Sequence, residues 1–186
     1  MAFLSPGEMI RMLSLLLLWG AARPVDAQLP AFDEYQVKAA FLYNFAKFVE
    51  WPPGTFANSN DPIGICIVGQ NPFGSTLDDM VQGKKIGDRA FAVWRLPDTQ
   101  HANQCQILFI GTAEWKRTGS LLEGLKGAGV LTVGESDDFA ALGGIINFKR
   151  EGTRVRIQIA LKTADRTKLR ISSKLLSLAE IVKPQP

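Results

Sequence analysis

The chain has 186 residues, of which 46% are hydrophobic and 21% charged, and its formal net charge is +3. These values are typical of one globular domain with a sizeable core, and they argue against a disordered or repeat protein. The small positive surplus is spread along the chain. It therefore argues against nucleic-acid binding, which needs a clustered basic face.

The N-terminal stretch has the layout of a secretory signal peptide. Arg11 precedes a short apolar run, MLSLLLLWGAA, and small residues follow before Gln28. Crossing a bilayer takes about 20 apolar residues, so a cleaved leader is favoured over an uncleaved anchor. We expect residues 1–27, starting at Met1 or Met9, to be a signal peptide cut after Ala27. Residues 28–186 then form one exported domain, without direct membrane insertion after cleavage.

Cys66 and Cys105 are the only cysteines. An exported chain reaches an oxidising compartment, where an even number of cysteines normally means disulfide pairing. We therefore predict one structural disulfide, worth roughly 4 kcal/mol because it closes a long loop. The alternative is two buried free thiols, since each cysteine lies in or beside an apolar run.

The exported region opens with a helical pattern, DEYQVKAAFLYNFAKFVEWPP. Asp33 can cap this helix, and Glu34 lies four residues before Lys38, which suits an ion pair. Two prolines end the helix by Trp51. Apolar residues recur every three or four positions and predict a core-facing stripe: Val37, Phe41, Phe45 and Phe48.

Five short apolar runs follow, and helical patterns separate several of them. Runs of this length without alternation are typical of strands buried on both faces of a parallel sheet. The expected strands are IGICIV, FAVWRL, CQILFIG, GVLTVG and GIINFK, and the expected helices lie in 71–83, 117–129 and 136–144. We predict an α/β fold, with a mainly parallel sheet of about five or six strands flanked by helices, Rossmann-like or flavodoxin-like.

The C-terminal part changes character. A turn at 149–154 precedes Val155, Ile157 and Ile159, which alternate with polar residues and predict the second arm of a hairpin, an antiparallel edge strand. The segment ISSKLLSLAEIVK then predicts a final helix that begins near Ser172 or Ser173. Its apolar face would hold Leu175, Leu176, Ala179 and Val182.

Catalytic and metal-binding patterns are scarce. The chain has one histidine, His101, and contains neither an HExxH motif nor a His/Cys cluster with metal-ligand spacing. His101 lies near Cys105, but a bridged cysteine cannot act as a nucleophile. The adjacent pairs Asp78–Asp79 and Asp137–Asp138 fall in the first turns of expected helices, where the helix dipole stabilises them. We therefore predict no catalytic residue, no metal site and no cofactor.

The segment IVGQNPFGST resembles a phosphate-binding loop but lacks its lysine, and Pro72 removes a backbone donor. Three expected strands end in a glycine and a polar residue, at the sheet edge where α/β proteins bind ligands. Tight strand-to-helix connections also explain these glycines. The ligand-binding candidates are Gly69, Gln70, Asn71, Gly111, Thr112 and Glu135.

Five segments in series resemble the YfiR-like family of bacterial periplasmic regulators. They are EYQVKAAFLYNFAKFVEWP, ICIVGQNPFG, CQILFI, VLTVGESDDFAALGGIINF and LRISSKLLSLAEIV, and together they run from Glu34 to Val182. The resemblance implies a non-catalytic periplasmic protein that binds the sensor domain of an inner-membrane diguanylate cyclase and holds the cyclase inactive. Release would raise cyclic di-GMP and favour biofilm growth. The resemblance also implies that homodimers can form.

Cys66 and Cys105 match the bridging positions of that family, whereas a second cysteine pair of some members is absent here. Ile157 and Ala160 stand where the family often has phenylalanine and asparagine. A different interpretation is a periplasmic small-ligand sensor that acts on a histidine kinase or another membrane protein. An enzyme is the third alternative.

Overall fold

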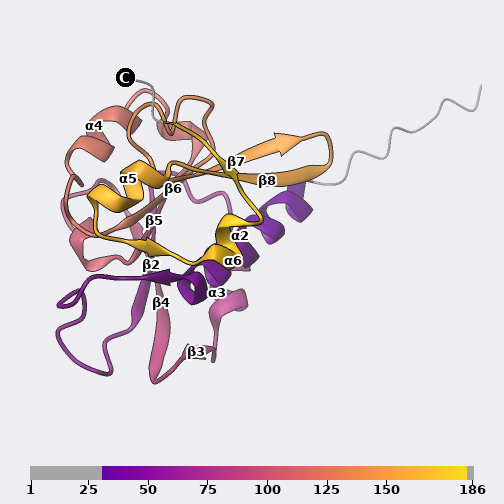
Figure 1. Cartoon of the computed structure of the whole chain (residues 1–186). Helices are drawn as coiled ribbons and strands as arrows, with labels where there is room; N and C mark the ends of the chain where they lie inside the picture. The colour runs from indigo at the N-terminus through magenta and orange to yellow at the C-terminus, as the bar shows by residue number, and fades with distance from the viewer. Residues whose placement is uncertain (1–30, 184–186) are drawn as a thin grey trace, which may run out of the picture.

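A computed structural model describes residues 31–183, so the predicted signal peptide lies outside the described residues. These residues have an α/β fold (Figure 1). Its longer elements are α2 (Ala31–Phe48), β2 (Ile63–Val68), α3 (Thr76–Val81), β4 (Arg89–Leu96), β5 (Ile107–Ile110), α4 (Thr118–Glu123), β6 (Leu131–Gly134), β7 (Ile146–Glu151), β8 (Arg154–Ile159) and α5 (Leu161–Arg166).

The shorter elements are β1 (Val49–Glu50), β3 (Lys85–Ile86), η1 (Ala102–Gln104), η2 (Thr112–Glu114), β9 (Arg170–Ile171), α6 (Ser173–Leu176) and β10 (Glu180–Ile181). The main sheet has the order β10-β8-β7-β6-β5-β2-β4-β3, and β1 pairs separately with β9. The five strands from β7 to β4 are parallel, while β8 and β3 run antiparallel to their neighbours β7 and β4. The predicted α/β class and mainly parallel sheet are confirmed.

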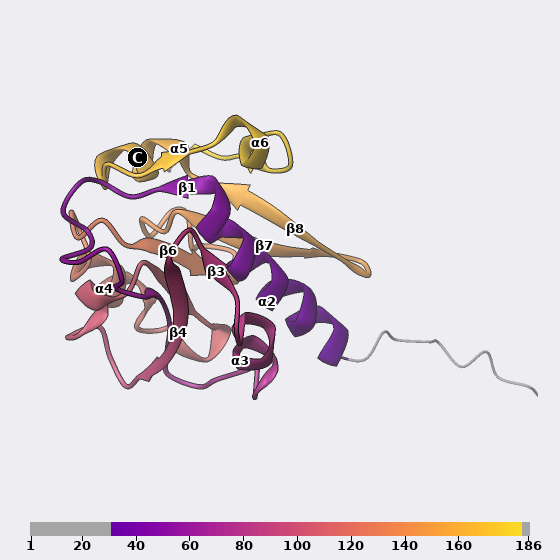
Figure 2. The same cartoon turned by 90° about the horizontal axis from the view of Figure 1, so that it is seen from below.

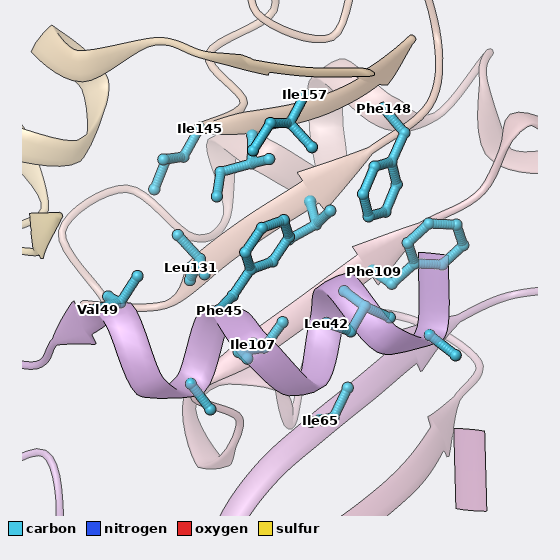
Figure 3. Close-up of a cluster of buried hydrophobic side chains, with 14 of the residues drawn as sticks. Leu42, Phe45, Val49, Ile65, Ile107, Phe109, Leu131, Ile145, Phe148 and Ile157 are labelled. Carbon is cyan, nitrogen blue, oxygen red and sulfur yellow. The ribbon is translucent and has the colours of Figure 1, made fainter. Parts of the chain in front are cut away.

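The larger core lies between the sheet and α2. Leu42 and Phe45 are fully buried and point from the helix toward the strands (Figure 3), where Phe109 and Phe148 meet them. The predicted stripe is partly wrong, because Val37 is 43% exposed while Leu42 has no exposed surface. Glu34 and Lys38 form the predicted ion pair, with 2.6 Å between Oε1 and Nζ.

A smaller core contains Cys66, Leu108 and Phe139, together with the buried leucines of α4. Cys66 of β2 and Cys105, which follows η1, form a disulfide with a Cα–Cα distance of 5.9 Å. The predicted bridge is therefore present. It fastens β2 to the segment that leads into the adjacent strand β5.

The predicted helix at 136–144 is absent, and a series of turns stands in its place. The fully buried ring of Phe139 lies so close to Gly134 and Gly144 that a Cβ at either glycine would overlap it. The chain must therefore fold back around this ring. A straight helix over residues 136–144 would carry the chain away from the ring.

The predicted C-terminal helix is also shorter than expected. Ser172 caps α6, with its Oγ accepting a hydrogen bond from the Leu175 amide at 3.3 Å, but the helix ends at Leu176. The chain then turns, and β10 pairs in parallel with β8. β8 is antiparallel to β7, as predicted, and the short strand β10 lies on the other side of β8. Within residues 31–183, no helix is both long and apolar enough to span a membrane.

Candidate functional site

The order of the strands places a topological switch point between β2 and β5. From β2 the chain proceeds to β4 on one side, and from β5 it proceeds through β6 and β7 on the other. In open α/β sheets, ligands usually bind outside the carboxyl ends of the strands at such a point. Gly69 and Gly111 follow β2 and β5 directly, so the sequence candidates meet at this edge.

The side chain of Glu114 occupies the space beside Gly69. This glycine has φ = +75°, and a Cβ built on it would overlap the Glu114 carboxylate. Only 14% of the Glu114 side chain is exposed, and its Oε2 accepts a hydrogen bond from Arg117 Nη1 at 3.2 Å. Part of the expected crevice is therefore filled by a side chain of the protein itself.

The loop after β2 uses its own hydrogen-bonding groups. Asn71 Oδ1 accepts a hydrogen bond from the Phe73 amide at 3.1 Å, and Asn71 Nδ2 donates to the Gly74 carbonyl at 2.9 Å. The Gly69 amide donates to Leu96 O of β4 at 3.0 Å. Two amides that a phosphate-binding loop would direct at an anion are thus engaged. Gln70 and Asn71 stay ligand-binding predictions.

A buried charge network lies on the other side of the switch point. Glu135 follows β6, and 5% of its side chain is exposed. Its Oε2 accepts a hydrogen bond from Lys38 Nζ at 2.6 Å, and its Oε1 accepts from the Thr112 amide at 3.1 Å and from Tyr35 Oη at 3.3 Å. Lys38 also pairs with Glu34, so one buried ammonium bridges two carboxylates. The network ties α2 to the carboxyl ends of β5 and β6.

Tyr35 reports the electrostatic environment of this network. Burial of the ring, the negative charge of Glu135, its hydrogen bond to Glu135 and the charge of Glu34 raise the pKa of Tyr35 to about 12. The Lys38 ammonium lies 4.6 Å from the Tyr35 ring centroid. The phenol therefore stays protonated at neutral pH and serves as a hydrogen-bond donor.

The structure thus brings together Gly69, Gly111, Thr112 and Glu135, as the strand pattern suggested. The sequence did not identify Lys38, Tyr35 and Glu114 as members of this cluster. Only the Glu34–Lys38 spacing pointed toward it. Within residues 31–183, no group of three or more histidine, cysteine or acidic side chains has an arrangement suited to a metal ion.

A cavity of about 450 Å³ lies elsewhere, between α3 and the β3–β4 hairpin. Its walls include Val81 of α3, Phe91 and Val93 of β4, and the lysines Lys84 and Lys85. None of the sequence candidates lines it. The signal that marks this region is the pair of adjacent lysines just before a short turn.

Paired side chains fill part of the crevice at the switch point of this α/β fold, and the two cysteines of the sequence are joined. The description YfiR/HmsC-like (DUF4154) belongs to a family model that matches residues 35–180. The chain therefore belongs to the YfiR/HmsC-like family, a family of periplasmic regulators. The disulfide fits the oxidising compartment in which that family acts.

Two solved structures are similar to this chain at very low sequence identity. A conserved domain protein from Vibrio cholerae is 8% identical, with a TM-score of 0.51 over 80% of this chain. An ABC domain from Streptococcus pneumoniae in complex with L-Trp is 7% identical, with a TM-score of 0.48 over 64% of this chain. The chain spans 60% and 55% of the lengths of these two proteins. No curated protein matches the chain.

Proposed function

We propose that this protein is a non-catalytic periplasmic repressor that binds the sensor domain of an inner-membrane diguanylate cyclase and holds the cyclase inactive. Membership of the YfiR/HmsC-like family over residues 35–180 carries this proposal. The disulfide adds independent support, because such bridges persist in oxidising compartments such as the periplasm. Export would follow from a signal peptide cut after Ala27, which N-terminal sequencing of the mature protein tests.

The buried charge network is consistent with a protein that does not catalyse a reaction. A general acid or base needs a free position next to a substrate. Glu135 instead accepts hydrogen bonds from Lys38, Tyr35 and Thr112, all within the protein. These contacts give the carboxylate a structural role in holding α2 on the sheet.

Deletion of the gene tests this function. We expect cyclic di-GMP and surface attachment to rise, and both to return to the starting level when the wild-type chain is restored. The mature chain should also co-purify with a membrane-bound diguanylate cyclase, and deletion of that cyclase should cancel the effect. Unchanged cyclic di-GMP after deletion of the gene would contradict the proposal.

A second candidate function is a small-ligand sensor that acts on a histidine kinase or another membrane protein. The position of Gly69 and Gly111 at the switch point favours it, because ligands collect there in related folds. A ligand that binds only the folded state must raise the melting temperature. A thermal-shift screen of periplasmic solutes should therefore find a stabilising compound, and Gly111→Val should reduce its effect. A screen without any stabilising compound would count against the sensor.

A further inference from the structure

Most of β4 is paired along one side only. Residues 91–96 pair with β2, whereas the two residues of β3 reach only Arg89 and Ala90. Among the strands that the structure describes, no other pairs with β4. The β3–β4 hairpin accordingly ends the sheet (Figure 2). An edge of this kind presents unpaired backbone groups.

The register shows which groups point outward. The Leu96 carbonyl accepts a hydrogen bond from Gly69, so Leu96 faces β2. Along a strand, backbone groups of successive residues point to opposite sides. The amides and carbonyls of Phe91, Val93 and Arg95 therefore point away from β2. Arg89 pairs with Ile86 of β3 on the side of β4 away from β2, as this alternation requires.

Both faces of this open edge carry apolar surface. On one face, Phe91 and Val93 form part of the cavity of about 450 Å³ beneath α3. On the other face, Trp94 is 36% exposed, and its ring covers Gly64 of β2. A strand added beside β4 would place alternate side chains over the cavity and next to Trp94. The edge thus combines backbone pairing with two places for side chains.

The charges around the cavity favour an acidic occupant. Lys84 and Lys85 line it, and neither forms an ion pair with any residue in 31–183. The ammonium groups of Lys84 and Lys47 lie 4.6 and 4.1 Å from the ring centroid of Tyr43. Tyr43, which packs against Phe91 of β4, therefore holds two ammonium groups near its ring, one of them from the cavity wall.

The carboxylates that also line the cavity are already engaged. Asp78 pairs with Arg95, with 2.8 Å between Oδ1 and Nη1, and Asp79 accepts a hydrogen bond from Ser75 Oγ at 3.0 Å. Among the charged groups that line the cavity, Lys84, Lys85 and Asp79 have no ion-pair partner within residues 31–183, so two unpaired positive charges outnumber one negative charge. Partner segments that carry glutamate or aspartate would supply a counterion.

We propose that the outer edge of β4 is the docking surface for an extended segment of the membrane partner. This segment pairs with Phe91, Val93 and Arg95 through its backbone and directs acidic side chains toward Lys84 and Lys85. Peptide recognition by strand addition works in this way, with backbone bonds for affinity and alternate side chains for specificity. The inference rests on the proposed function, because that function supplies a membrane partner.

Photo-crosslinking in cells tests the surface. The full chain is made with the photoreactive amino acid p-benzoylphenylalanine in place of Phe91, and a second form carries it at Trp115. Trp115 is 63% exposed and lies between η2 and α4. We expect the form altered at Phe91 to crosslink to an acidic, extended segment of a membrane protein, with at least tenfold more product than the form altered at Trp115.

Two pairs of variants separate charge from backbone. Lys84→Glu with Lys85→Glu should reduce the crosslinked product at least tenfold, whereas the exposed Lys162→Glu on α5 should leave it unchanged. Val93→Pro removes an outward amide and should reduce the product similarly, whereas Val93→Ala keeps that amide and much of the product. Thermal unfolding of each purified variant shows whether it folds, and the lysine pair tests the proposal even where Val93→Pro does not fold.

Each other outcome overturns the docking surface. A membrane protein crosslinked from Trp115 but not from Phe91 would leave the proposed function intact and place the contact elsewhere. Crosslinking from Phe91 only to a second copy of the chain would assign the edge to a homodimer. No product from either position would mean that the lysines and the short β3 simply protect the edge from aggregation, and co-purification would then judge the proposed function separately.

Discussion

Charged side chains meet the sheet in two places that differ in how completely they are paired. Near the switch point, the buried ammonium of Lys38 bridges Glu34 and Glu135, and Glu135 accepts further hydrogen bonds from Tyr35 and Thr112. At the edge of β4, Lys84 and Lys85 lack ion-pair partners within the described residues. The charged groups of the first region are paired within the protein, whereas the two lysines of the second region are available to another molecule.

This difference follows from solvent access. A buried charge without a partner is costly, so folding must bring its partners with it. An exposed lysine stays hydrated at little cost and is available to another molecule. The usual ligand position of an α/β sheet thus has a structural role here, and the edge of the sheet is the better candidate for contact. Mutations should accordingly affect stability in the first region and binding in the second.

Removal of the disulfide should cause the largest loss of stability. Cys66 and Cys105 are 39 residues apart, and a loop of that length corresponds to about 4 kcal/mol in the chain-entropy model. The double variant Cys66→Ala, Cys105→Ala should lose this free energy of unfolding in urea titrations. Reductant should destabilise the wild type by a similar amount and leave the double variant unchanged. Equal stability of oxidised and reduced wild type would refute the prediction.

Loss of the buried ammonium should have the next largest effect. Lys38→Met leaves Glu135 buried without a cation, which should cost about 3 kcal/mol, the lower end of the range for a broken buried pair. The hydrogen bonds from Tyr35 and Thr112 that remain justify the lower end. As a control, Lys126→Met breaks an exposed pair with Glu123 and should cost less than about 0.5 kcal/mol. Similar costs for both variants would show that the network is not structural.

The main strands could be predicted because the sheet buries them. β2, β5 and β6 are covered on both faces, so each appears as a continuous apolar run. The two-residue strands β3 and β10 have no periodicity and form only because a longer strand lies beside them. For this reason the sheet has eight strands instead of five or six.

The buried face of α2 could be predicted less accurately than the strands. Val37 and Leu42 are both apolar, and spacing alone favoured Val37 for the core stripe. Leu42 is buried and Val37 exposed because the position of the sheet and of α3 decides which face of the helix is covered. The prediction of a helix at 136–144 was wrong for a related reason. The apolar spacing there is helical, but spacing holds no information about the contact of Phe139 with two glycines.

The candidate site was predictable only in part. Parallel strands end at one edge, so Gly69, Gly111 and Glu135 come together as a consequence of the fold. Lys38, however, lies 97 residues from Glu135 in sequence and reaches it only because α2 crosses the sheet. No local spacing encodes that contact. The Glu34–Lys38 spacing, which predicts an ion pair within the helix, was the one available signal.

Tyr35 should make a smaller contribution to stability that depends on pH. Tyr35→Phe removes the hydrogen bond to Glu135 and should cost about 1 kcal/mol at neutral pH. The folded pKa of about 12 lies above the ordinary value of 10.0, so this stability is present below pH 10 and is lost as pH rises toward 12. Urea titrations of both proteins at a series of pH values check this. The wild type should lose more stability than Tyr35→Phe between pH 10 and 12, and parallel curves would contradict the pKa assignment.

The ion pair at the edge of β4 should matter least. The Asp78 and Arg95 side chains are 41% and 37% exposed, so solvent screens them, and Asp78→Asn should cost only about 0.5 kcal/mol. The hydrogen bond from Arg95 lowers the pKa of Asp78 below its usual value of 3.8. The contribution of Asp78 to stability is therefore present above pH 3.8 and is lost as the pH falls through the lowered pKa of this carboxylate. A double-mutant cycle with Arg95→Gln measures the coupling, and a value near 3 kcal/mol would show that this edge is as tightly built as the switch point. A coupling energy near 0.5 kcal/mol would support the distinction between the switch point and the edge of β4. Exposed groups at a docking surface should contribute little to folding, because they must be available to the partner strand.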